Sequence, residues 1–297
     1  MRIAVVGLGG VGGYLAANFA KVGLDVIGFA RGEHLSAIQT HGIKVIEDDD
    51  CWNQKIDVRA LEDLDGFFEG YFDVVFFCVK SYDIENSYKQ IRSHINEKTI
   101  LLSFSNGVTN GKLLTKISYS KVLEGCIYIL SHIEEAGAIR KKGKVFAAVF
   151  GGDDESTQIV AQIFEDSKLR YKVPDNIETA IWKKYIFISA FATATSFFNK
   201  SISRVYEENF EMIKTLLDEI AKVAHAKRIE IFDEVPKALD TASKVPSDAS
   251  TSMQLDFQNK KEVELESLSG YIVDEGLKRG VDTPLMNKMY KYLKTKV

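Results

Sequence analysis

The amino-acid sequence predicts an α/β protein with two domains. The N-terminal domain is expected to contain a doubly wound, largely parallel sheet, and the C-terminal domain to be all-α. Short β-branched apolar runs alternate with helical patterns in the first half, a glycine-rich turn follows the first run, and helical periodicity dominates after Pro174. The 297 residues suffice for two domains, expected at residues 1–174 and 175–297.

The first half alternates strands and helices, as a doubly wound sheet requires. The expected strands are Ile3–Val6, Asp25–Phe29, Asp73–Val79, Thr99–Phe104, Lys121–Ile133, Lys144–Phe150 and Leu169–Val173. The expected helices are Tyr14–Val22, 82–94, 108–117 and Ser156–Ser167. We interpret the basic run RKKGK at 140–144 as the tip of a hairpin, and the acidic run Glu47–Asp50 as an exposed turn.

The second half shows helical spacing of its apolar residues and almost no strand pattern. The expected helices are Asn176–Phe198, Glu207–Lys227, Ser252–Asn259 and Glu262–Lys278. The apolar stretch Tyr185–Phe198 is shorter than the about 20 residues that a membrane span needs. We therefore expect a buried core helix there and no membrane partner.

Composition excludes several classes of function. The net charge of −4 disfavours nucleic acid as a partner. Cys51, Cys78 and Cys126 are odd in number and widely spaced, which indicates neither a disulfide framework nor a zinc site. The histidines have no metal-ligand spacing, so no metal is expected. The chain begins with its first strand, with no room for a signal peptide, and a cytoplasmic location is expected.

A glycine turn lies between the first strand and the first helix, in the stretch IAVVGLGGVGGYLAANF at 3–19. G-x-G-x-x-G is a weak signal alone, but strand, turn and helix form the context of a Rossmann dinucleotide site. Gly7 allows the tight turn, Gly9 the approach of the pyrophosphate, and Gly12 close helix packing. The alternative is an ordinary βα turn. The candidate cofactor-binding residues here are Gly7, Leu8, Gly9, Gly10, Val11 and Gly12.

The end of the second strand favours NADP(H) over NAD. NAD-binding domains usually place an acid there to hold the ribose 2′-OH. This chain reads GFARGEHL, with Arg31 at that position and no acid between Val26 and Gly32. A guanidinium suits a 2′-phosphate. In the alternative, Arg31 is a surface residue and Glu33 serves the ribose.

Two further polar residues follow buried strands. Lys80 comes after DVVFFCV, and Asn106 after TILLSF. Ligands of open α/β sheets bind beyond the carboxyl ends of the strands, so both residues are candidates for binding an anionic cofactor or substrate. Taken alone, Lys80 could equally be a solvated lysine.

Lys184 lies in the apolar helical stretch IETAIWKKYIFISAFATATSFF. Ala180 and Ile181 precede it by one turn, and Phe187 and Ile188 follow it. A partly desolvated lysine becomes a competent proton donor near neutral pH. The alternative is a snorkelling lysine that covers apolar surface. Lys183 is expected to face outward more than Lys184.

These residues together resemble the ketopantoate reductase family (2-dehydropantoate 2-reductases) over nearly the whole chain. The matching motifs are GLGGVG, ARGEHL, VKSYD, SNGV, the W-x-K of Trp182 and Lys184, TSMQLD and EVELESLSGYIV. The resemblance implies a Rossmann domain that binds NADPH and a helical domain similar to the C-terminal domain of 6-phosphogluconate dehydrogenase. It implies reduction of 2-dehydropantoate to pantoate, a step of pantothenate and coenzyme A biosynthesis.

The resemblance also assigns roles to residues. Lys184 would protonate the carbonyl oxygen, Ser252 would bind the substrate carboxylate, and Glu264 would help hold substrate, lysine and cofactor. Lys80 and Asn106 would lie beside the nicotinamide and the substrate. Glu262 and Glu266 flank Glu264, whose choice rests on alignment.

Three positions depart from the family pattern. Members often carry asparagine where this chain has Ile188, Ala192 and Ala249. These asparagines are expected to hold the lysine and the substrate hydroxyl, so their loss leaves the reaction type intact and the substrate open. Alternatives are a reductase of another small branched 2-oxo acid and a non-catalytic NADP(H) sensor. A monomer or homodimer is expected.

Overall fold

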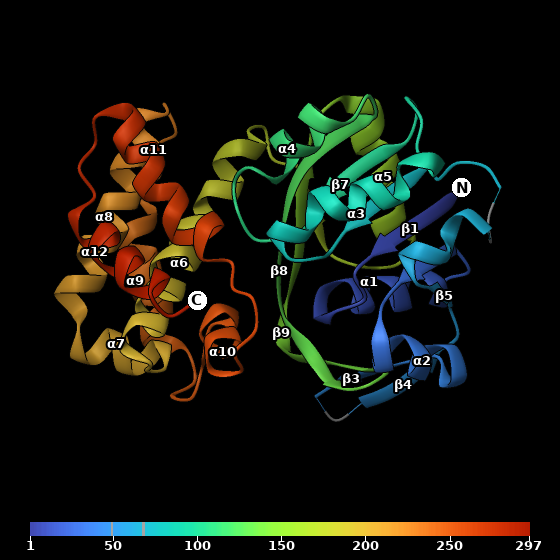
Figure 1. Ribbon diagram of the computed structural model, residues 1–297, viewed down its shortest axis with the longest axis horizontal. Coiled ribbons are helices and arrows are strands. Elements are labelled where there is room, and N and C mark those ends of the chain that lie inside the picture. Colours follow the sequence, from blue (N-terminus) through green and yellow to red (C-terminus); the bar gives the residue numbers. More distant parts are fainter. Residues whose placement is uncertain (49, 67–68) are drawn as a thin grey trace. The chain divides into compact units, whose positions relative to one another are not determined.

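The computed structural model describes residues 1–48, 50–66 and 69–297 (Figure 1). The chain divides into two compact units, of which the first contains Met1–Ser105 and Thr109–Ile177. The second contains Asn106–Val108 and Glu178–Val297.

The described residues of the N-terminal unit form a ten-stranded sheet with helices on both faces (Figure 1). Its strands are β1 (Arg2–Val6), β2 (Asp25–Phe29), β3 (Ile43–Glu47), β4 (Asp50–Gln54), β5 (Asp57–Arg59), β6 (Val74–Phe77), β7 (Ile100–Ser103), β8 (Lys121–Glu135), β9 (Ala138–Gly151) and β10 (Tyr171–Lys172). Its helices are α1 (Gly10–Lys21), α2 (Gly32–His41), α3 (Ile84–Ile91), α4 (Asn110–Ile117) and α5 (Asp154–Asp166).

The strand order is β4-β3-β9-β8-β7-β6-β1-β2-β5, with β10 beside β9. The strands from β5 across to β8 pair in parallel, whereas β3–β4 and β8–β9 are antiparallel. Residues of α1 and α5 pack on one face of the sheet, and residues of α3 and α4 pack on the other. The predicted fold class is therefore confirmed.

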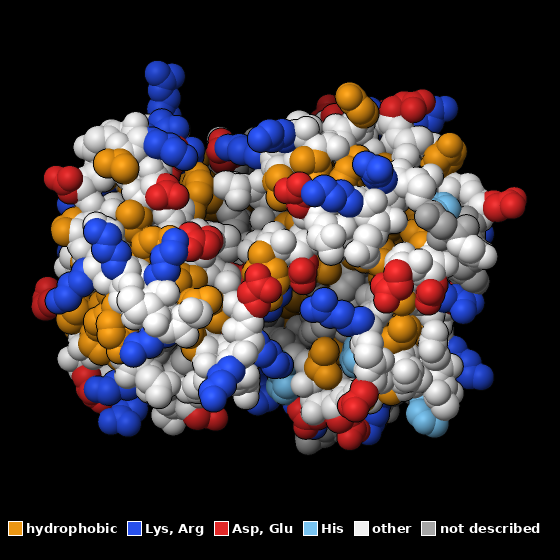
Figure 2. All heavy atoms as spheres, in the orientation of Figure 1, with side chains coloured by type: hydrophobic (Ala, Val, Ile, Leu, Met, Phe, Trp, Pro, Cys, Tyr) orange, Lys and Arg blue, Asp and Glu red, His pale blue; other side chains and the backbone are white. Residues whose placement is uncertain are grey.

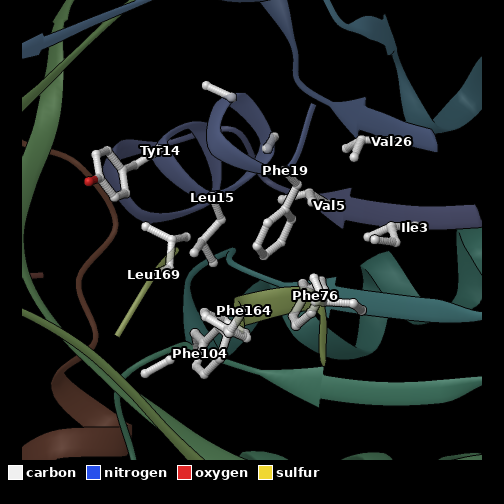
Figure 3. Packing of buried hydrophobic residues seen from close by; sticks show 14 of the residues in the cluster. Ile3, Val5, Tyr14, Leu15, Phe19, Val26, Phe76, Phe104, Phe164 and Leu169 are labelled. Carbon is white, nitrogen blue, oxygen red and sulfur yellow. The ribbon is translucent and has the colours of Figure 1, made fainter. Parts of the chain in front are cut away.

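Alternating residues of each central strand supply the two cores of this unit. In the larger core, Phe19 of α1 meets Phe76 of β6 at a ring-centroid distance of 5.4 Å, and Phe76 stacks on Phe104 at 5.9 Å (Figure 3). Phe164 of α5 closes the cluster against Phe19 at 5.5 Å. The second core lies on the opposite face of the same strands, because successive side chains of a strand point to opposite sides.

The β8–β9 hairpin corrects the prediction for RKKGK. The turn is at Ala136–Gly137, where Gly137 has φ +81°, and Arg140–Lys144 lies inside β9. The pairing shifts between Ile129 and Ser131, so the part of this run around Gly143 (φ +66°) forms a bulge. Lys141 is not solvated, because it is buried and forms an ion pair with Glu47 at 3.2 Å.

The acidic run contains the turn between β3 and β4, as predicted: Glu47 and Asp50 pair across the hairpin, and Asp48 is an exposed turn residue. Glu47 is the last residue of β3 and is partly exposed. Its carboxylate accepts a hydrogen bond from the Tyr14 hydroxyl at 3.0 Å. Asp50 begins β4. Asp49, which falls between them, lies outside the described residues.

The described part of the C-terminal unit is helical. Its helices are α6 (Ile177–Phe198), whose first residue belongs to the other unit, α7 (Ile202–Glu208), α8 (Phe210–Ala226), α9 (Glu234–Lys244), α10 (Ser252–Gln258), α11 (Tyr271–Arg279) and α12 (Pro284–Lys294). The predicted helix Glu207–Lys227 is interrupted at Asn209, and the one expected from Glu262 begins at Leu265. A π-helical turn, Glu266–Gly270, leads into α11.

Helix α6 is a core helix, as its apolar sequence predicts. Its fully buried residues include Ile186, Ala190 and Phe191. Within the residues described, no helix combines the length and apolar character needed to cross a bilayer. On the face visible in Figure 2, acidic and basic side chains are interspersed, in keeping with the small net charge of −4.

Candidate active site

In the glycine turn between β1 and α1, a side chain at Gly7 or Gly12 would clash with the protein, whereas Gly9 has free space beside it. Gly7 has φ +92°, and a Cβ there would lie 2.7 Å from Val79 Cγ1. A Cβ on Gly12 would lie 2.1 Å from the carbonyl oxygen of Gly7, so only glycine lets α1 start this close to the strand. A Cβ on Gly9 would meet nothing within 4 Å. Gly9 therefore leaves space beside the helix N-terminus, where a phosphate group would fit.

The side chain of His34 links this glycine turn to the turn of the β8–β9 hairpin. Its Nε2 lies 2.8 Å from the carbonyl oxygen of Leu8, and its Nδ1 accepts the amide of Gly137 at 3.0 Å. These partners assign the proton to Nε2 and make the ring neutral. Burial lowers the pKa of His34, and the bond to Leu8 opposes this shift. A lone histidine in a polar helix gives no sequence signal for this bridging role.

Arg31 is exposed at the end of β2. It is the N-cap residue of α2, its side chain is 89% exposed, and its Nη2 lies 3.8 Å from Asp83 Oδ2. Glu33 is exposed in the first turn of α2. An acid thus lies near Arg31, but it comes from the segment after β6, which the local pattern around the arginine could not reveal.

Lys80 and Asn106 follow neighbouring strands but belong to different units. Lys80 follows β6 in the N-terminal unit, where the hydroxyl of Ser105 donates to the Val79 carbonyl at 2.5 Å and joins the ends of β6 and β7. Asn106, the next residue, belongs with Gly107 and Val108 to the C-terminal unit. Gly107 has φ +124°, which lets the chain turn sharply here.

Adjacent lysines of α6 have different partners. Lys184 Nζ donates to Asn106 Oδ1 at 2.9 Å. Lys183 Nζ lies 3.4 Å from Glu234 Oε1 at the start of α9, and its side chain is 38% exposed. The structure thus brings together Lys184 and Asn106, two of the predicted site residues, and directs Lys183 to a surface ion pair.

The three candidate glutamates differ in burial. Glu264 is 3% exposed, and its carbonyl accepts the amide of Leu268 at 3.1 Å. Glu262 is exposed. Glu266 is also exposed and accepts the hydroxyl proton of Tyr290 at 2.6 Å. Burial therefore singles out Glu264 as the glutamate suited to an enclosed role.

Ser252 is the first residue of α10 and is exposed. The capping role falls to Thr251, whose hydroxyl accepts the amide of Gln254 at 3.3 Å and lies 2.7 Å from Thr195 Oγ1 of α6. Because Thr251 caps the helix, the Ser252 hydroxyl is not required for that purpose.

Two of the three positions at which an asparagine is expected lie shortly after Lys184 in the sequence. Ile188 and Ala192 follow Lys184 by one and two helical turns on the same face of α6. Ile188 is half-buried and Ala192 is buried. In the described residues there is no cluster of three or more His, Cys, Asp or Glu arranged to hold a metal ion.

Comparison with family models decides the relationship of the chain to known proteins. Residues 3–152 match the model "Ketopantoate reductase PanE/ApbA", and residues 176–297 match "Ketopantoate reductase PanE/ApbA C terminal". The chain belongs to the ketopantoate reductase family. It is therefore an oxidoreductase, and the predicted family is confirmed.

Individual proteins and solved structures are similar to this chain over nearly their whole length. An uncharacterized oxidoreductase, YkpB of Bacillus subtilis, is 25% identical over 302 residues, covering 99% of this chain and 98% of its own. The solved 2-dehydropantoate 2-reductase of Porphyromonas gingivalis is 29% identical with a TM-score of 0.82, covering 99% of each chain. D-mandelate dehydrogenase, solved with NADH and anilino(oxo)acetate, has a TM-score of 0.89 at 21% identity, covering 100% of this chain and 98% of its own.

Proposed function

We propose that the protein uses NADPH to reduce a small 2-oxo acid to the 2-hydroxy acid, with 2-dehydropantoate as the first candidate substrate. The observation that carries the proposal is the hydrogen bond from Lys184 Nζ to Asn106 Oδ1 at 2.9 Å. Asn106 belongs to the loop that follows β7, and ligands of α/β sheets bind at such loops, which supports Lys184 as the proton donor. The family membership supports the same reaction class.

The N-terminal unit is proposed to bind the cofactor. Gly9 leaves room for the pyrophosphate at the start of α1, and Arg31 is exposed and available to a 2′-phosphate. Asp83 would repel that phosphate, and its surface pair with Arg31 is weak enough, about 0–1 kcal/mol, to be displaced. Lys80 would contribute a further positive charge. The bound cofactor would supply the hydride.

The C-terminal unit is proposed to supply the proton. Hydride addition to the keto carbon places negative charge on oxygen, which the Lys184 ammonium can neutralise and protonate. Asn106 would hold the ammonium through its amide oxygen, and buried Glu264 would keep the lysine and the substrate in place. Ser252 would donate its hydroxyl to the substrate carboxylate.

A second candidate is a 2-oxo acid with a more apolar side chain. It is favoured by Ile188 and Ala192, which put apolar surface on the lysine-bearing face of α6. One structural relative, D-mandelate dehydrogenase, was solved with the aromatic ligand anilino(oxo)acetate. A non-catalytic NADP(H) sensor remains the alternative from another class.

Turnover with a panel of 2-oxo acids tests these candidates. NADPH oxidation would be followed with 2-dehydropantoate, unbranched and branched aliphatic 2-oxo acids, and an aromatic 2-oxo acid. The highest kcat/KM with 2-dehydropantoate supports the first candidate, and a preference for an apolar acid supports the second. NADPH binding without turnover of any acid would support the sensor and contradict the reductase.

A further inference from the structure

Helix α6 carries a row of buried hydroxyl groups beside its lysine. Tyr185, Ser189 and Thr193 are four residues apart and therefore share one face of the helix. Tyr185 is 2% exposed, and the other two are fully buried. A fully buried row of hydroxyls is costly unless each finds a partner, so the row points to a specific contact.

The partners of this row lie on the π-helical turn Glu266–Gly270. Tyr185 Oη donates to the carbonyl oxygens of Ser267 and Leu268, at 2.9 and 2.7 Å. Ser189 Oγ donates to the Leu268 carbonyl at 2.9 Å. The hydroxyls of Thr193 and Ser269 lie 2.7 Å apart. Three consecutive residues of the turn are thus tied to α6.

The widened geometry of the turn explains why hydroxyl donors are needed. The amide of Tyr271 donates to the Glu266 carbonyl, five residues back instead of the four of an α-helix. The backbone hydrogen bonds of the turn therefore do not follow the regular i to i−4 pattern of an α-helix. Tyr185 and Ser189 supply donors to the carbonyls there, which would otherwise be costly to bury.

Aromatic packing holds the same two segments together. The ring of Trp182 lies 5.4 Å from that of Tyr185 and 6.1 Å from that of Tyr271, centroid to centroid. Trp182 is 1% exposed. The tryptophan of the W-x-K motif therefore anchors the lysine-bearing turn of α6 to the start of α11.

The π-turn leads directly back to Glu264. The Glu264 carbonyl accepts the Leu268 amide at 3.1 Å and the Ser267 hydroxyl at 3.2 Å. Tyr185 is the next residue after Lys184 on α6. The hydrogen bonds of Tyr185 and Ser189 therefore connect α6, next to Lys184, to residues that are themselves hydrogen-bonded to Glu264.

We propose that Tyr185 and Ser189 are positioning residues of the reductase: they hold the turn Glu266–Gly270 on α6 so that Glu264 and Lys184 keep the arrangement that proton transfer requires. The proposal rests on the proposed function of Lys184 and Glu264. Neither hydroxyl is assigned a contact with substrate or cofactor.

The test uses Tyr185→Phe and Ser189→Ala, which remove only the hydroxyl groups. The matched control is Ser167→Ala, because Ser167 is also a buried serine that donates to a backbone carbonyl, that of Ile163 at 2.7 Å, but it is the C-cap residue of α5 in the N-terminal unit. The readouts are kcat, the KM for the 2-oxo acid, the Kd for NADPH, the Tm, and the solvent kinetic isotope effect on kcat.

Each positioning variant should lose about ten- to a hundredfold in kcat, because small displacements of reacting groups have effects of that size. The KM for the acid and the Kd for NADPH should stay within about twofold, since neither hydroxyl contacts a ligand. The solvent isotope effect should rise, because a displaced donor makes proton transfer more rate-limiting. A purely structural role would lower the Tm without changing the isotope effect.

The proposal is overturned if both variants match Ser167→Ala in kcat and in isotope effect, or if kcat falls only in proportion to the folded fraction. If Tyr185→Phe does not fold, Ser189→Ala decides alone. Failure of the proposed function looks different: the parent protein would then reduce no 2-oxo acid, or Lys184→Ala would retain full activity.

Discussion

Substituting the glycines of the first turn should separate cofactor binding from folding. In Gly9→Ala the new Cβ meets no atom of the described residues within 4 Å apart from its chain neighbours, and the backbone angles of Gly9 (φ −69°, ψ −163°) are open to any residue. The unfolding free energy should therefore hold or rise, by about 0.4–1 kcal/mol, through the lower entropy of the unfolded chain.

The same methyl group would occupy the space assigned to the pyrophosphate. Losing one charge-assisted hydrogen bond costs about 1.5–3 kcal/mol, so NADPH affinity should fall by roughly ten- to more than a hundredfold. In Gly12→Ala, by contrast, the Cβ would lie 2.1 Å from the Gly7 carbonyl oxygen. Overpacking of this kind costs about 1–3 kcal/mol, so this variant should lower the Tm.

The assay is calorimetric titration with NADPH beside thermal unfolding of the ligand-free protein. The expected pattern is a stable Gly9→Ala protein that binds NADPH poorly and a destabilised Gly12→Ala protein. If Gly9→Ala bound NADPH as tightly as the parent, the turn would not be the phosphate site.

Three further outcomes are expected. Arg31→Ala should weaken NADPH binding by about ten- to a hundredfold and spare NADH, whereas Asp83→Asn should strengthen NADPH binding; equal effects on both cofactors would contradict selection of the 2′-phosphate. Ser252→Ala should raise the KM for the 2-oxo acid with the Kd for NADPH unchanged, and the opposite pattern would contradict its contact with substrate. Because burial lowers the pKa of His34, the neutral ring, whose Nδ1 accepts the Gly137 amide, stabilises the fold fully above about pH 6.5, and this stabilisation is lost as pH falls; the Tm of the parent should therefore drop more steeply between about pH 6.5 and 5 than that of His34→Gln, and parallel curves would contradict this role of the neutral ring.

Local patterns predict the central strands and the glycine turn because their signals are contained in a few residues. Val74–Phe77 is continuously apolar, as a strand buried on both faces must be. Strand β4, DCWNQ, has no such run and lies at the edge of the sheet, so its sequence did not predict it. The prediction of a hairpin tip at RKKGK is wrong because a charged run with glycine is compatible with a bulge as well as with a turn. The burial of Lys141 depends on its ion pair with Glu47, which the local sequence does not reveal.

In the candidate site, too, some features follow from the local sequence and others depend on residues that are distant in the sequence. The sequence marks Lys184 as unusual but leaves burial and snorkelling open, because its hydrogen-bond partner Asn106 is 78 positions away. The choice of Glu264 among three glutamates likewise depends on burial, which only the fold determines. Tyr185 and Ser189 read as ordinary residues of an apolar helix until the π-turn that they contact is known.

The most direct test of the central claim compares Lys184→Ala with Lys183→Ala. The measurement is kcat for NADPH-dependent reduction of the best 2-oxo acid, beside the Kd for NADPH. Lys184→Ala should lose about 10²–10⁴-fold in kcat with NADPH binding intact, whereas Lys183→Ala, which removes ion pairs with Asp233 and Glu234, should stay within about a few-fold of the parent. A larger loss for Lys183→Ala, or full activity of Lys184→Ala, would contradict the assignment of Lys184 as the proton donor.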